Sequence, residues 1–215
     1  MYFNRNRPIP REDWPEPHGG GAKLWYVLTN HFFQLIWANL LCMVFCLPIV
    51  TIPAAFCGLH AVVQQYVRKG YGDVFSTFWM EFRTAFLPRL GLSAAMLCLP
   101  VIGWLLGGLL AEWAAYALCA VLLVFVLLVF GWFFPQLAIL KLRPGQALRN
   151  AVLLTALESW RNLLLLLIQL VPAAVVVVLW PFTVIVLLTL VPVLPVLLMT
   201  VVVNPVLENK IIREP

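Results

Sequence analysis

Long runs of apolar residues without charge constrain the fold of this chain more than any other feature. Four such runs extend from the 90s to 111, from 114 to 140, from 163 to 180 and from 182 to 203. Each is about as long as the roughly 20 helical residues that cross the hydrocarbon core of a bilayer. A water-soluble domain of 215 residues could not bury that much apolar surface. The sequence therefore predicts an all-α fold, a polytopic bundle of transmembrane helices.

The positions of the 14 Lys and Arg residues predict how the bundle is oriented. They gather in the N-terminal tail, in residues 68–89, in residues 141–161 and at the C-terminus, whereas the connections near Glu112 and Trp180 contain none. Basic loops remain on the cytoplasmic side of a membrane protein. All 14 lie on that side if residues 24–67 form two spans, which gives about six membrane crossings and two cytoplasmic termini. The net charge of +5 is interpreted as an orientation signal, and no nucleic-acid partner is predicted.

Residues 24–67 are too long for a single crossing of roughly 30 Å. Pro48 and Pro53 predict a break between residues 47 and 53, because proline lacks a backbone donor and clashes with the preceding helical turn. The piece that follows Pro53 is short, so it is either a short span or a re-entrant arm. If this first hairpin is re-entrant or a single span, the number of crossings falls to five.

The polar ends of the chain set the expected domain boundaries. Residues 1–22 and 208–215 are predicted to be cytoplasmic tails, the first of them disordered and without the features of a signal peptide. Residues 23–207 are predicted to form a single transmembrane helical domain. Within it, residues 73–87 are expected to form a cytoplasmic amphipathic helix, lying at the membrane interface or docking on a partner. Its aromatic residues recur at helical spacing and include Phe75, Phe78, Trp79 and Phe82.

Two pairs of polar residues make the first hairpin unusually polar. Asn30 and Gln34 lie one helical turn apart, as do His60 and Gln64, so each pair shares one face of its helix. Polar groups within lipid need hydrogen-bond partners, which neighbouring helices commonly supply. The four residues are therefore expected either to form interhelical contacts or to line a path for a polar substrate.

The sequence contains no motif of a known catalytic or metal-binding site. It lacks a metalloprotease helix motif, a glycine-rich phosphate loop and a Cys-x-x-Cys pair, and its five cysteines all lie in apolar segments, where a free cysteine packs as a small hydrophobe. We therefore predict no catalytic activity, no cofactor and no bound metal.

One stretch of the chain resembles a known family. The resemblance rests on Lys23-Leu24-Trp25, on the Leu-Pro-Ile-Val-Thr-Ile turn at residues 47–52 and on the charged, Phe-rich stretch at residues 74–86. In these features, residues 23–90 resemble the YesL-like bacterial integral membrane proteins, which carry a domain of unknown function. The resemblance implies a multi-pass protein of the bacterial plasma membrane.

The resemblance also implies a cellular context, because members of that family are often encoded near genes for carbohydrate uptake and degradation. It favours an accessory or permease-like component of carbohydrate uptake, with the lipid bilayer and other membrane transport subunits as partners. The alternative from the residues themselves is a membrane scaffold or regulatory partner that transports nothing. Small size, the absence of a buried charge relay and the aromatic cytoplasmic helix support this alternative.

Overall fold

The computed structural model describes residues 20–48, 51–107, 112–140, 143–178 and 191–207. Within these residues the fold is all-α, as predicted. The first four helices are α1 (Gly20–Asn30), α2 (Phe32–Cys46), α3 (Ile52–Lys69) and α4 (Val74–Gly107). They are followed by α5 (Glu112–Leu140), α6 (Pro144–Leu157), α7 (Ser159–Val178) and α9 (Val193–Leu207). Residues 1–19 of the predicted N-terminal tail, the predicted C-terminal tail and residues 182–190 of the span predicted at 182–203 lie outside the described residues. Residues 20–22 of the N-terminal tail lie in α1.

The number of candidate spans differs from the prediction. Among the described residues, two helices are long and apolar enough to cross a membrane: Trp113–Leu140 and Ser159–Val178. The bent pair Leu24–Asn30 and Phe32–Cys46 makes a third if it is counted as one span. This gives two or three candidate spans rather than six. Two of the predicted crossings account for part of the difference. The helix after Pro53 is too polar for a candidate span, and the run predicted at 182–203 is described only from residue 191.

The first predicted span is bent by 87° between α1 and α2. No proline causes this bend. Two polar side chains precede it, and both bond back to their own helix: the Thr29 hydroxyl donates to the Trp25 carbonyl, and the Asn30 amide donates to the Tyr26 carbonyl. Such bonds compete with the regular backbone pattern and favour a kink. The chain therefore turns at His31 instead of continuing straight to residue 47.

The second break falls where the prolines predict it. α3 begins at Ile52, with Pro53 in its first turn, where the missing backbone donor costs nothing. Thr51 closes the preceding turn, since its backbone N–H and its hydroxyl both donate to the Pro48 carbonyl. At the other end, Gly70 terminates α3 with a φ of 68°, a left-handed conformation that glycine adopts without strain.

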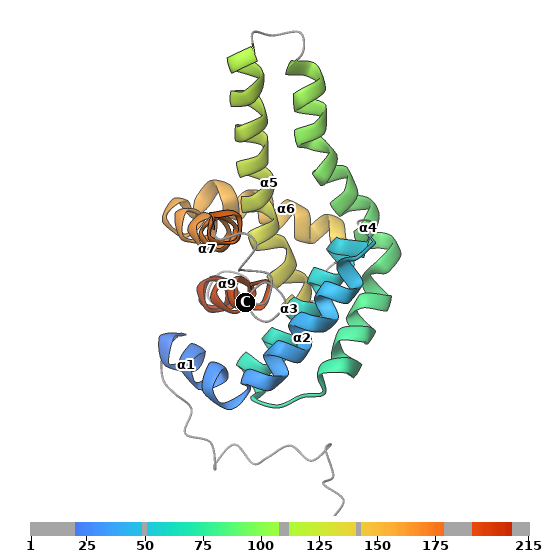
Figure 1. The fold of residues 1–215 in the computed structure, drawn as a ribbon, viewed down its shortest axis with the longest axis vertical. Helices are drawn as coiled ribbons and strands as arrows, with labels where there is room; N and C mark the ends of the chain where they lie inside the picture. Colours follow the sequence, from blue (N-terminus) through green and yellow to red (C-terminus); the bar gives the residue numbers. More distant parts are fainter. Residues whose placement is uncertain (1–19, 49–50, 108–111, 141–142, 179–190, 208–215) are drawn as a thin grey trace, which may run out of the picture.

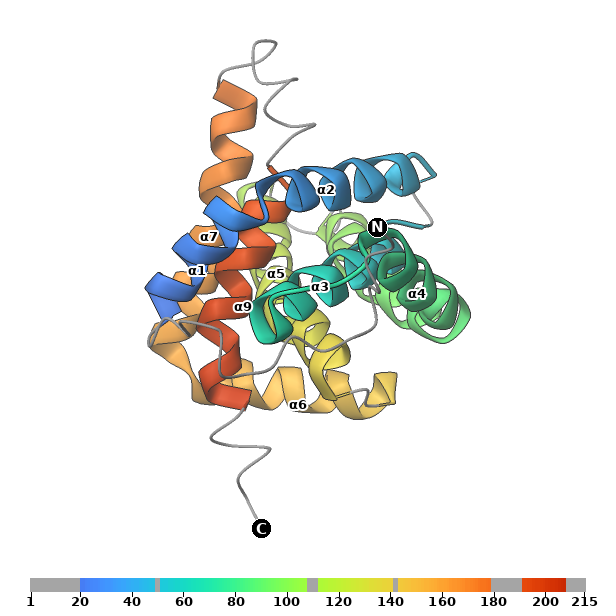
Figure 2. The ribbon, with the colours of Figure 1, turned by 90° about the horizontal axis from the view of Figure 1, so that it is seen from below.

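α3 is the central helix, and α9 packs beside it (Figure 2). One hydrophobic cluster joins α1, α2, α3 and the start of α4 to the start of α9, and a second joins α5, α6 and α7 to α3 and α9. The buried residues of α3 include Leu59, Val62 and Val63, each almost completely inaccessible. α3 is not a candidate span because it is too polar, with His60, two glutamines and two basic residues among its 18 residues. Protein covers its apolar surface.

The distal half of α4 and the first half of α5 form a hairpin that extends beyond the rest of the protein (Figure 1). Its outer surface is apolar and exposed, with Leu105, Trp113 and Tyr116 all more than 60% accessible. α7 crosses α5 steeply in the two views and also exposes apolar side chains, including Val177 and Val178. In water such surfaces would be a liability, whereas lipid covers them without cost.

Candidate functional site

The residues predicted as a polar hairpin lining fall into two different environments. Asn30 and Gln34 are exposed, and the Asn30 amide is bonded within α1. His60 and Gln64 are buried on α3, at 2% and 5% accessibility. The structure therefore brings His60 and Gln64 into the interior and leaves the other two on the surface.

Gln64 makes an interhelical contact. Its side-chain Nε2 donates to Oδ1 of Asn204 on α9, at 2.9 Å. A second such contact lies at the first residue of α9. The backbone N–H of Val193 donates to Oδ1 of the buried Asn39 on α2, at 3.1 Å. That N–H belongs to the first turn of α9 and has no partner within its own helix. Amide side chains thus fix α9 against both α2 and α3.

A third contact of this kind joins α5 to the start of α7. The indole Nε1 of Trp132, which is fully buried, donates to Oδ1 of Asn162 at 2.8 Å. The Asn162 amide nitrogen in turn donates to the Thr155 carbonyl at the end of α6. One side chain therefore connects three helices, a role that was not predicted from the sequence.

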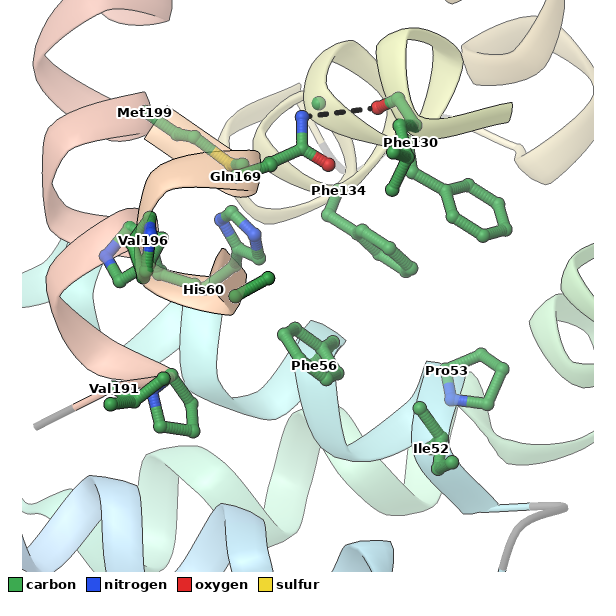
Figure 3. A pocket seen from close by; sticks show the side chains of 16 residues that line it. Ile52, Pro53, Phe56, His60, Phe130, Phe134, Gln169, Val191, Val196 and Met199 are labelled. Carbon is green, nitrogen blue, oxygen red and sulfur yellow. Dashed lines mark hydrogen bonds between the residues drawn. The ribbon is translucent and has the colours of Figure 1, made fainter. Parts of the chain in front are cut away.

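A cavity of about 370 Å³ lies between α3, α5, α7 and α9 (Figure 3). α3 contributes the wall that contains His60, and α5 contributes Phe130 and Phe134 to the lining. The lining is Ile52, Pro53, Phe56, His60, Leu127, Phe130, Gly131, Phe134, Gln169, Pro172, Ala173, Val191, Pro192, Pro195, Val196 and Met199. The walls are almost entirely apolar, and no acidic or basic residue is among them.

His60 is one of the two side chains in this lining with hydrogen-bonding groups. Its imidazole stacks on Phe134, with ring centroids 5.7 Å apart. Its Nδ1 is buried and has no hydrogen-bond partner among the described residues. An unpaired buried polar atom costs roughly 1–3 kcal/mol, and a hydrogen-bond partner within the cavity would remove that cost.

Gln169 is the other polar residue of the lining, and its amide nitrogen is already engaged. Nε2 donates to the Leu127 carbonyl on α5 at 3.2 Å and to the Leu165 carbonyl on its own helix at 3.1 Å (Figure 3). The crossing of α5 and α7 is close here because Gly131 has no side chain: a Cβ at that position would lie 3.2 Å from the amide nitrogen of Gln169. Gln169 was not predicted as a site residue, although an amide within an apolar run was the available signal.

The predicted aromatic helix is the first part of α4, which continues without interruption to Gly107. Its four predicted contact residues divide by face. Phe78 and Phe82 are buried, and both rings pack on Phe45 of α2, at centroid distances of 5.6 and 4.8 Å. Phe75 and Trp79 are exposed, and their rings stack on each other. Phe78 and Phe82 thus pack inside this chain and Phe75 remains on the surface. Trp79 is exposed on one side, and its ring also lies 5.7 Å from that of Phe45.

The described residues contain no group of three or more His, Cys, Asp or Glu side chains that could hold a metal ion. Cys42 and Cys46 approach within 3.9 Å between their sulfur atoms along one face of α2, and both thiols are free.

Part of this chain is similar to a known family. Residues 32–108 match the family described as "Protein of unknown function, DUF624". The DUF624 segment begins with the first residue of α2 and covers α3 and α4, so it contains His60 and Gln64 but none of the cavity wall from α5, α7 and α9. No curated protein and no solved structure matches the chain.

Proposed function

We propose that this protein is an accessory subunit of a bacterial plasma-membrane complex for carbohydrate uptake, and that it does not itself carry the sugar. The cavity is the observation behind this choice. Sugars have many hydroxyl groups, and a site that carries them needs several placed polar groups. The described cavity offers His60 and Gln169 in an otherwise apolar wall. It therefore supports the non-transporting interpretation of the sequence ahead of the permease interpretation.

The surface of the protein supports a membrane location. α5 and α7 combine the length of a span with exposed apolar side chains, as a lipid-facing helix does. The resemblance of residues 23–90 to the YesL-like proteins supports the association with carbohydrate uptake. The distribution of Lys and Arg supports cytoplasmic termini.

In this proposal the polar residues hold helices together and take no part in catalysis. Within the complex, the exposed Phe75 and Trp79 are the natural contact for a cytoplasmic neighbour, because aromatic side chains are enriched at interfaces between proteins. Gln64, Asn39 and Asn162 would hold the subunit in one shape.

A flux assay with purified protein tests the proposal. We expect proteoliposomes that contain the protein alone to take up labelled mono- and oligosaccharides no faster than protein-free liposomes. Affinity purification from cells grown on the relevant sugar should recover transport subunits with the wild-type protein, and less of them with a Phe75→Asp/Trp79→Asp variant. Gln34→Asp, a change at another exposed position, is the control for surface charge. Saturable sugar uptake by the protein alone would contradict the proposal.

A further inference from the structure

We infer that the cavity between α3, α5, α7 and α9 binds an uncharged amphiphile from the bilayer, a molecule with one apolar chain and a single hydroxyl group. This binding site is independent of any role in carbohydrate uptake.

The lining of the cavity favours a ligand whose larger part is apolar. Its side chains include Phe56, Phe130 and Phe134 around one part of the space, and Val196 and Met199 around another (Figure 3). Water gains few hydrogen bonds in such a cavity, and apolar cavities commonly remain dry until an apolar molecule fills them. The volume of about 370 Å³ lies at the lower end of the range for small-molecule sites, roughly 300–1,000 Å³.

His60 provides a hydrogen-bonding position for one polar group of the ligand. Its Nδ1 lacks a partner among the described residues, and the ring borders the cavity. The amide nitrogen of Gln169 already donates to two carbonyls. A hydroxyl group is the smallest partner that suits either tautomer of the imidazole, because it can both donate and accept a hydrogen bond.

The absence of charge in the lining excludes a charged head group. No Lys, Arg, Asp or Glu is among the lining residues. A carboxylate or phosphate placed there would lose its hydration without gaining an opposite charge.

The bilayer is the source of the ligand. Two of the four helices around the cavity, α5 and α7, are candidate spans with exposed apolar surfaces. Ala173, an exposed residue of the candidate span α7, is also part of the cavity lining. A molecule dissolved in the hydrocarbon layer reaches the cavity there without passing through water.

Binding of labelled 1-dodecanol to the full chain in lipid nanodiscs tests the inference. We expect saturable binding near one molecule per chain, at least tenfold tighter than that of dodecanoate at pH 8. His60→Leu should weaken dodecanol binding roughly three- to tenfold, which corresponds to the loss of one hydrogen bond. This variant is expected to fold, because the replaced Nδ1 has no partner to lose.

A second pair of variants tests the position of the site. Ala173→Trp obstructs the opening and should reduce dodecanol binding at least tenfold. Ala174→Trp, at an exposed position of the same helix outside the lining, should leave it unchanged. The inference is wrong if dodecanol and dodecanoate bind equally, if His60→Leu binds dodecanol like the wild type, or if Ala173→Trp and Ala174→Trp behave alike.

Discussion

Replacing Trp132 by alanine is expected to lower the free energy of unfolding by about 3–5 kcal/mol, the range for removal of a large aromatic side chain from a core. Trp132 is the largest of the fully buried side chains, and it lies in the cluster that joins α5, α6 and α7. The change leaves a cavity and also removes the indole N–H that Asn162 accepts. Thermal unfolding of the purified protein in a mild detergent measures the loss.

Trp113→Ala is the matched control for this prediction. Trp113 is 76% exposed at the start of α5, so its loss should change the unfolding temperature little. If the two variants unfolded at the same temperature, Trp132 would not lie in a packed core.

Replacing Gly58 by leucine is expected to separate α3 from α4 and to destabilise the protein by about 3 kcal/mol, at the upper end of the usual overpacking range. A Cβ at this position would lie 2.9 Å from two ring atoms of the buried Phe78 and 3.1 Å from its carbonyl oxygen. The ring could shift only by disturbing the contact with Phe45, and the carbonyl is fixed within α4. Size-exclusion chromatography and thermal unfolding should show less monodisperse and less stable protein.

Gly145→Leu controls for the general effect of replacing a helical glycine. A Cβ at Gly145 meets nothing within 4 Å, so this variant should match the wild type or exceed it slightly in stability. A Gly58→Leu protein as stable as the Gly145→Leu protein would show that α3 and α4 do not cross closely at this position.

The helical class could be predicted from sequence, since long apolar runs separated by basic segments permit little else. The environment of each run could not be predicted, because a helix buried in protein and one facing lipid have similar hydropathy. α9 illustrates this ambiguity, because it is about as apolar as α5 although most of its side chains pack against other helices. α3 was expected to be a short span or a re-entrant arm, and its apolar side chains pack against other helices. The bend at His31 was missed because no proline or glycine marks it.

The candidate site was predictable only in part. The polarity of His60 and Gln64 within an apolar segment gave a local signal, and both are buried. The partners of these residues lie far away in the sequence: Asn204 bonds Gln64, and Phe134 stacks on His60. No local pattern reveals which helices cross, so the cavity and its lining by Gln169 and Met199 required the fold itself.

The membrane orientation of α5 is the central claim of this account, since the exposed hairpin, the lipid access to the cavity and the accessory role all depend on it. Reporter fusions after Glu112 and after Arg149 test it most directly, because these positions flank α5. We expect the Glu112 fusion to report the outside and the Arg149 fusion to report the cytoplasm, as the basic residues of 141–161 require. If both fusions reported the same side, α5 would not cross the membrane and the account would be wrong.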